Sequence, residues 1–305
     1  MKICVIGQYV RDEIHLHDER ILESHGGIFF ALGAFSAITS AGDSVHPIFP
    51  VGNDCETELR RAMEKLHRII PKDVFTFYEP TTRVKLFYST PTAYQTCLVS
   101  ELPPLPFEKI IPHLDADVIY INMMTAQDIT IEVAEQVRSR TGALIFLDVH
   151  MLAYEVGEMG KRELRPNPDW KRWCSIADVV QMNEREASAF LESDLDVSTV
   201  VERIFETTNV AIVIITRGEN GAFVYERKQE GFRKHEILAH SIDAIADTTG
   251  CGDSFGAAFA FHFRKYGNAH NAGVFASFVA SRGAMLHGSD GIEQLQDLLQ
   301  NGVTA

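Results

Sequence analysis

Strand-length apolar segments alternate with helical segments over most of the middle of this chain. The alternation runs from about residue 107 to residue 216. Such a rhythm predicts successive strand–helix–strand units, which place their strands in a parallel sheet with helices on both faces. The sequence therefore predicts an α/β fold with three layers, α/β/α, around a mostly parallel sheet. The predicted strands cover 117–122, 143–148, 178–182 and 210–216.

The rest of the chain extends this pattern and adds a region of different texture. Residues 74–100 carry β-branched and aromatic residues in alternation, which predicts short strands, and residues near 10–20 are expected to contribute to the same β region. We expect one domain over residues 1–305, in which these strands form a small β lid; two decorative hairpins are the alternative. The remaining predicted elements are strands over 2–7 and 45–51, helices over 27–42 and 54–67, and a largely helical region after 253.

The composition of the chain argues against several classes of protein. A formal net charge of −14 argues against a surface for nucleic acid or for anionic membranes. No run of 18 apolar residues suggests a membrane span, and the N-terminus enters a strand without the pattern of a cleavable signal. The five cysteines are scattered and form no C-x-x-C pair, which predicts reduced thiols in a cytoplasmic protein.

A glycine-rich loop at residues 247–255 carries the clearest chemical signal. Gly250 and Gly252 allow the backbone to approach a ligand, and the helix that follows adds partial positive charge, so the loop suits a phosphate. Asp253 would repel that phosphate at rest. We therefore interpret Asp253 either as a helix N-cap or as a base that takes a proton from an attacking hydroxyl.

The nonapeptide Asp247-Thr248-Thr249-Gly250-Cys251-Gly252-Asp253-Ser254-Phe255 resembles the D-T-x-G-[AC]-G-D-x-F motif of the ribokinase-like (PfkB) carbohydrate kinases. Other landmarks of that family follow in order over about residues 2–290. The resemblance implies that Asp253 is the catalytic base. It also implies that Gly250, Cys251 and Gly252 donate N–H groups to the charge that develops on the phosphoryl group.

The resemblance further implies a donor site for ATP and Mg²⁺. Asn183 and Glu186 match the family's N-x-x-E element, in which Asn183 lies near the phosphates and Glu186 organises Mg²⁺ through water. Read alone, Glu186 is an exposed acid in the first turn of a helix, where the helix dipole favours it. The resemblance also implies nucleotide binding by Thr216, Gly218, Gly221 and Ser277. The alternative for each of these residues is a role in a turn or in helix packing.

Asp247 and Thr249 occupy positions that bind a monovalent cation such as K⁺ in some members of the family. The alternative for both residues is the chemistry of a tight turn. The requirement for such a cation is left open at this stage.

The acceptor side departs from the family pattern. Asp12 resembles the aspartate that binds substrate hydroxyls, and Gly26 and Gly27 match paired glycines that let substrate approach the backbone. The family usually places an asparagine four residues later, where this chain has Ala31. Asp54 fits a V-G-x-D element, with a helix-starting aspartate as its alternative.

Three other residues, His150, Arg83 and Lys85, give weaker signals of function. After Asp148 the chain reads Val149-His150-Met151 where the family has proline and asparagine, and we interpret His150 as a surface or packed imidazole. Arg83 and Lys85 on the lid could meet a substrate phosphate, but a solvated strand face is the favoured interpretation.

These patterns predict an ATP-dependent kinase that phosphorylates a hydroxyl of a sugar or sugar-like molecule, with Asp253 as the base. A nucleoside kinase of the same fold is the first alternative, and a catalytically silent nucleotide-binding regulator is the second. We expect no nucleic-acid or membrane partner. Relatives often dimerise through their lid strands, so the resemblance allows a homodimer, with a lid edge blunted by charge as the alternative.

Overall fold

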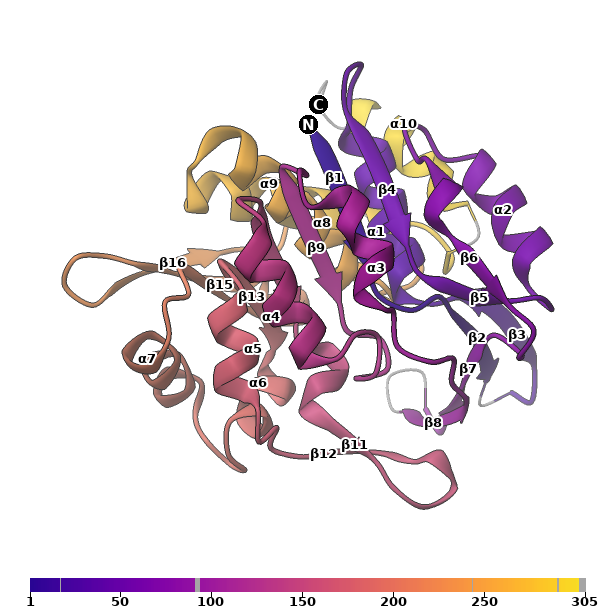
Figure 1. Cartoon of the computed structure of the whole chain (residues 1–305), viewed down its shortest axis with the longest axis horizontal. Coiled ribbons are helices and arrows are strands. Elements are labelled where there is room, and N and C mark those ends of the chain that lie inside the picture. The colour runs from indigo at the N-terminus through magenta and orange to yellow at the C-terminus, as the bar shows by residue number, and fades with distance from the viewer. Residues whose placement is uncertain (17, 91–93, 243, 290, 302–305) are drawn as a thin grey trace.

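The main sheet of the protein is mostly parallel and is covered by helices on both faces (Figure 1). The computed structural model describes residues 1–16, 18–90, 94–242, 244–289 and 291–301. Within these residues the main sheet has eight strands, of which β15 and β16 run antiparallel to their neighbours. In order across the sheet, the strands are β16 (Phe232–Ile237), β15 (Ala222–Arg227), β14 (Ile212–Thr216), β13 (Val179–Asn183), β10 (Leu144–Asp148), β9 (Val118–Asn122), β1 (Lys2–Ile6) and β4 (Ser44–Ile48).

Side-chain alternation along the central strands divides the interior into two cores. Ile3 and Val5 of β1 belong to one cluster of buried side chains, and Cys4 and Ile6 belong to the other. This follows from the period of two in a strand, which sends successive side chains to opposite faces. The central strands are mostly apolar because both faces of the sheet are buried.

Each core is closed by its own set of helices. The first core contains residues of α1 (Gly27–Ile38), α2 (Glu56–Glu64), α8 (Cys251–Tyr266), α9 (Ala269–Gly283) and α10 (Leu295–Asn301). The second contains residues of α3 (Phe107–Ile110), α4 (Ile131–Arg140), α5 (Trp170–Ile176), α6 (Glu184–Phe190) and α7 (Val197–Thr207).

A smaller sheet lies beside the main one. In the part of the chain that the structure describes it has four strands, in the order β3 (Ile21–His25), β2 (Val10–His15), β7 (Thr82–Tyr88) and β8 (Tyr94–Ser100). Two short ladders complete the strands, β5 (Pro50–Gly52) with β6 (Phe75–Phe77) and β11 (Tyr154–Val156) with β12 (Arg162–Leu164). The predicted fold class, an α/β/α body with a small β lid, is confirmed.

Two element boundaries differ from the sequence prediction. The helix expected over residues 27–42 ends at Ile38, because Thr39 adopts an extended backbone and its hydroxyl donates to the carbonyl of Phe35. The single strand expected over 45–51 is split into β4 and β5, which pair with different neighbours. Among the described residues, every helix is too short or too polar to cross a bilayer.

Candidate active site

The glycine-rich loop enters α8 through a left-handed residue. Gly250 has φ 74° and ψ 3° and occupies the N-cap position of the helix. A Cβ at Gly250 would lie 2.1 Å from Cγ of Phe30, so neither the conformation nor the space admits a side chain. Asp253 is therefore not the N-cap, and that alternative is wrong.

The turn before Gly250 is closed by its own side chains. Oδ1 of Asp247 accepts hydrogen bonds from the backbone N–H of Thr249 at 2.8 Å and from its hydroxyl at 2.7 Å. The turn chemistry weighed for these two residues is thus present. A cation site at Asp247 and Thr249 stays a prediction.

Cys251 is partly enclosed by the protein, whereas Gly252 has open space beside it. The thiol of Cys251 lies 3.7 Å from the carbonyl of Ala280, and burial raises its pKa to about 12, so it stays protonated at neutral pH. A Cβ at Gly252 would meet no protein atom within 4 Å among the described residues. Open space beside the first turn of α8, whose N–H groups have no intrahelical acceptor, suits an anion.

Asp253 lies in that first turn and contacts the end of a neighbouring strand. Its Oδ1 accepts a hydrogen bond of 2.6 Å from Nδ2 of Asn122, the last residue of β9. Burial raises the pKa of Asp253, while the charge of His150 and the hydrogen bond from Asn122 act in the opposite direction. A Cβ at Gly27 would lie 2.8 Å from the same Oδ1, which places α1 against the carboxylate.

Asp12 reaches the same place from the small sheet. A Cβ at Gly26 would lie 3.4 Å from Oδ2 of Asp12, so the paired glycines lie between Asp12 and Asp253. Burial and the nearby charge of Asp253 raise the pKa of Asp12 to about 7, against the opposing charges of Arg162 and His150. The structure therefore brings Asp12, Gly26 and Gly27 together beside Asp253. Ala31, in contrast, is fully buried in the first core.

The structure adds His150 to the site, a residue that the sequence analysis assigned to surface or packed positions. It follows β10 with a left-handed φ of 30°, and its Nδ1 lies 3.2 Å from Oε1 of Glu186. Burial disfavours the charged ring, but the hydrogen bond to Glu186 and the charges of Glu186, Asp148 and Asp253 raise the pKa of His150 to about 9. His150 is therefore a cation at neutral pH among carboxylates.

Asn183 and Glu186 form a reciprocal capping box at the start of α6. The side chain of Asn183 accepts from the N–H of Glu186 at 2.9 Å, and Oε2 of Glu186 accepts from the N–H of Asn183 at 2.8 Å. Glu186 therefore does lie in a first helical turn, but the exposed position expected in its alternative interpretation is wrong, because the residue is only 3% exposed. Because Oε1 faces His150, both carboxylate oxygens of Glu186 have protein neighbours.

Asn122 and Gln181 are further site residues that sequence reasoning missed. Nε2 of Gln181 donates to Oδ2 of Asp148 at 3.1 Å and to the carbonyl of Gly252 at 3.0 Å, which joins β13 to β10 and to the loop. A usable signal existed, because polar residues near the carboxyl ends of parallel strands meet at one edge of the sheet. Buried polar residues in otherwise apolar strands mark such positions.

The residues predicted for the nucleotide are spread along the neighbouring edge. Thr216 ends β14 as the register partner of Asn183 on β13. Gly218 and Gly221 have φ 55° and 79°, and a Cβ at Gly221 would lie 2.0 Å from the carbonyl of Ile237. The hydroxyl of Ser277 is occupied within the chain, since it donates to the carbonyl of Leu238 and accepts from the N–H of His240.

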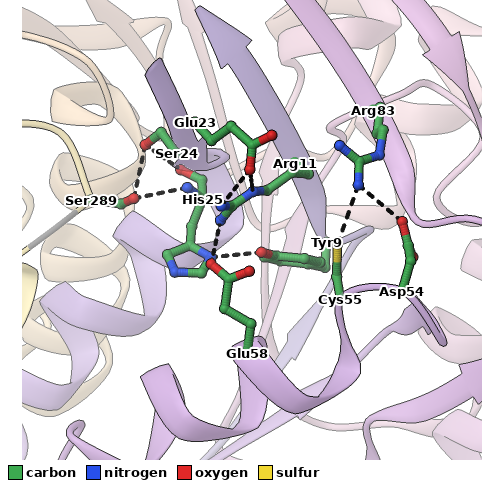
Figure 2. Close-up of polar contacts among 10 residues, drawn as sticks. All are labelled: Tyr9, Arg11, Glu23, Ser24, His25, Asp54, Cys55, Glu58, Arg83 and Ser289. Carbon is green, nitrogen blue, oxygen red and sulfur yellow. Dashed lines mark hydrogen bonds and ion pairs between the residues drawn. The ribbon is translucent and has the colours of Figure 1, made fainter. Parts of the chain in front are cut away.

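Ion pairs fasten the small sheet to the body of the protein. Figure 2 shows Arg11 of β2 between two carboxylates, with Nη2 2.8 Å from Glu23 of β3 and Nη1 2.8 Å from Glu58 of α2. The hydroxyl of Ser289 accepts from the N–H of His25 at 2.9 Å. The C-terminal part of the chain thereby supports the strand that leads into Gly26 and Gly27.

A second attachment centres on Asp54. Its Oδ1 accepts from the N–H and the hydroxyl of Thr81, and Oδ2 lies 3.0 Å from Nη2 of Arg83 on β7 (Figure 2). Burial opposes ionisation, yet the hydrogen bonds from Thr81 and Arg83 lower the pKa of Asp54 to about 2. Arg83 and Lys85 are both paired, since Lys85 lies 2.9 Å from Glu13.

We expect Asp54→Asn to lower the free energy of unfolding by about 1–2 kcal/mol, because it removes charge-assisted hydrogen bonds. The folded pKa is lower than the unfolded one, so this stabilisation is present above about pH 4 and is lost only as pH falls toward 2. Urea unfolding at pH 5 and pH 8 should therefore give equal losses. Glu64→Gln, on an exposed position of α2, is the control, and an equal loss there would contradict the assignment.

Comparison with known proteins gives the class to which this fold and site belong. The structure matches a pyrophosphate-dependent kinase in the ribokinase family with a TM-score of 0.79 at 18% identity, over 97% of this chain and 99% of that one. It matches the ribokinase of Thermotoga maritima with a TM-score of 0.78 at 18% identity, over the whole of both chains. The fold is therefore ribokinase-like.

Sequence comparison indicates the class of enzyme. Residues 162–289 match the model of the pfkB family carbohydrate kinases. The chain is also 24% identical over 263 residues to the cytidine kinase of Thermococcus kodakarensis, covering 85% of this chain and 87% of that protein. These matches indicate that the protein is an enzyme, a kinase of the carbohydrate and nucleoside class.

Proposed function

We propose that this kinase transfers a terminal phosphoryl group to a hydroxyl of a small polyhydroxylated acceptor, a sugar or sugar-like molecule, with Asp253 as the base. One observation carries the proposal. The carboxylate of Asp253 extends from the first turn of α8, accepts a hydrogen bond of 2.6 Å from Asn122, and lies beside the paired glycines. A base and an anion-binding helix end thus share one place, which is what attack of a hydroxyl on a phosphate requires.

The reaction balances without a covalent intermediate on the protein. The acceptor O–H proton passes to the carboxylate of Asp253 as the oxygen forms its bond to the terminal phosphorus of the donor. The bond from that phosphorus to the leaving oxygen breaks, and the shortened donor departs. The N–H groups of Gly250, Cys251 and Gly252 then act on the charge that develops on the phosphoryl oxygens, a contribution of positioning and electrostatics.

The residues at the strand ends fit a magnesium ion. Burial raises the pKa of Asp148, and the charges of Asp253 and Glu186 raise it further, which shows that the three carboxylates lie near one another. Oxygen ligands of this kind suit Mg²⁺. Asp148 and Glu186 would hold the ion, through water in the case of Glu186, since its oxygens already contact Asn183 and His150. When bound, Mg²⁺ neutralises phosphate charge.

We propose ATP as the donor, with Thr216, Gly218, Gly221 and the segment around Ser277 beside the nucleotide. One structural neighbour is a pyrophosphate-dependent kinase, so the assay should offer pyrophosphate in parallel with ATP. Activity in K⁺ and in a tetramethylammonium buffer tests the predicted cation at Asp247 and Thr249. Equal rates in both buffers would exclude a required monovalent cation.

A nucleoside is the second candidate acceptor, favoured by the likeness to a cytidine kinase. The asparagine usual in the family is replaced here by Ala31, which is buried. The prediction of a sugar acceptor therefore lacks one of the side chains expected to bind the sugar. A panel of hexoses, pentoses, cyclic polyols, sugar phosphates and nucleosides, assayed for ADP or phosphate release, separates the two. A catalytically silent regulator would release neither with any acceptor, while ATP still raised its Tm.

We expect the KM for the acceptor to rise as pH falls below about 7, because Asp12 then becomes protonated and no longer accepts from two hydroxyls. Asp12→Asn should give a high KM that varies little with pH. The raised folded pKa means that ionisation of Asp12 opposes folding, so the same variant should be more stable than wild type at pH 8 but not at pH 4. Glu13→Gln, on the opposite face of β2, is the control, and a wild-type KM profile in Asp12→Asn would contradict the role.

We also propose that the protein forms a homodimer through the small sheet. Several large apolar side chains of that sheet are more than one-third exposed, namely Ile21, Leu22, Phe87 and Val99. Burying such residues against a second copy would remove them from water. Sedimentation velocity over a range of concentrations tests this assembly, and a monomer at every concentration would exclude it.

A further inference from the structure

Two histidines and an aspartate converge at the edge of the main sheet, away from the residues assigned to phosphoryl transfer. His46 lies in the middle of the edge strand β4, Asp73 ends the 3₁₀ turn Pro71–Asp73, and His113 ends the 3₁₀ turn Ile111–His113. One potential ligand atom from each residue lies within 4.8 Å of the other two. The chain thus brings together three segments that are distant in sequence.

The polar atoms of this group are buried and lack hydrogen bonds. His46 is 8% exposed and His113 is 1% exposed. Among the described residues, no hydrogen bond reaches Nδ1 of His46, either ring nitrogen of His113 or Oδ2 of Asp73. Buried polar atoms without partners are rare and costly, so this group calls for a partner that the protein itself does not supply.

The separations fit ligands of one metal ion. Nε2 of His113 lies 3.1 Å from Oδ2 of Asp73, although the two atoms are not aligned for a hydrogen bond. Two ligands on a tetrahedral zinc ion, each at about 2.0–2.1 Å, are about 3.3 Å apart. The other ring nitrogen of His46 is 3.1 Å from the hydroxyl of Ser44, an orientation that leaves Nδ1 free for a metal.

The electrostatics are consistent with this use. A neutral imidazole is the form of histidine that binds metal ions. The charges of Lys2 and Lys72 disfavour a cation here, and the carboxylate of Asp73 opposes them. Two imidazoles with one carboxylate form a ligand set typical of zinc and its neighbours in the first transition row.

We infer that His46, Asp73 and His113 bind a divalent transition-metal ion of the Zn²⁺ type, with water in the fourth position. The ion would join β4 to the two 3₁₀ turns and so secure this edge of the main sheet, where Val45 already forms backbone hydrogen bonds with Arg68 and Ile70. This role is structural, and it does not depend on the proposed kinase activity or on its acceptor.

The test compares zinc binding by wild type and by His46→Gln/His113→Gln after removal of metals with a chelator. Millimolar Mg²⁺ in the buffer occupies the oxygen-rich active site. We expect elemental analysis after dialysis against Zn²⁺ to show one ion fewer per chain in the double variant, and Zn²⁺ to raise the Tm of wild type alone by several degrees. Co²⁺ should give the visible absorption of a tetrahedral site only in wild type.

Two further variants keep the inference falsifiable if the double variant folds poorly. Asp73→Asn changes a partly exposed side chain and should weaken Zn²⁺ binding at least tenfold while the protein stays folded. His235→Gln/His270→Gln removes another pair of neighbouring imidazoles, whose ring centroids are 5.6 Å apart. This double variant should bind Zn²⁺ as wild type does. Equal zinc content and equal Tm shifts in wild type and Asp73→Asn would overturn the site.

Discussion

Asp253→Asn is expected to lower kcat about 10²- to 10⁴-fold, the range that a positioned general base contributes. The amide oxygen of the new side chain can still accept from Nδ2 of Asn122, but it cannot take the proton of the acceptor. Burial raises the pKa of Asp253, so the loss of its charge should leave Tm unchanged or slightly higher at pH 8. Activity would then fall without any loss of stability.

The measurement is steady-state turnover with the best acceptor of the panel, together with thermal unfolding. Glu184→Gln is the matched control, since this exposed acid opens α6 at the same edge of the sheet without a role in the proposed chemistry. A kcat for Asp253→Asn within twofold of wild type would refute Asp253 as the base. The fold and the class of enzyme would be unaffected.

Gly250→Ala is expected to impair both stability and activity. A left-handed backbone costs a residue with a Cβ about 1–2 kcal/mol, and here the new methyl would also lie 2.1 Å from Cγ of Phe30. Relief of that clash requires the loop or α1 to move, which would displace the N–H groups from the phosphate. We expect Tm to fall by several degrees and kcat/KM to fall at least 100-fold, the effect of losing one oxyanion donor.

Gly252→Ala separates the two causes. Its backbone is not left-handed, and an added Cβ would meet no described protein atom within 4 Å, so Tm should stay close to wild type. Activity should still fall, because the methyl group occupies the space proposed for the donor phosphates. If Gly252→Ala keeps full activity while Gly250→Ala loses it, the phosphates do not lie beside Gly252.

The parts of the site carried by local sequence were the most predictable. Gly250 is required by a left-handed turn at a helix start, and such a requirement depends only on neighbouring residues. The first-turn carboxylate of Glu186 was expected from the helix dipole, and it forms a capping box. Asp12 and the paired glycines were found through the family resemblance rather than through their own pattern.

Residues that act across the sheet were not predictable in the same way. Asn122 is 131 residues from Asp253, and their hydrogen bond exists only because β9 and α8 end at the same edge. His150 shows no spacing that relates it to Glu186, 36 residues away. The pairing of Arg83 with Asp54 likewise depends on how β7 packs beside the start of α2.

The sequence by itself therefore predicted the layers of the fold, the position of the glycine-rich loop at a helix start and the residue proposed as the base. These features follow from periodicity, from glycine conformations and from a nine-residue motif, all of which are local. Only the tertiary structure decided which groups surround Asp253 and that Gly250 is the N-cap of α8. It also decided that His46, Asp73 and His113 lie together. Contacts between strands distant in sequence depend on register and packing, which no local pattern specifies.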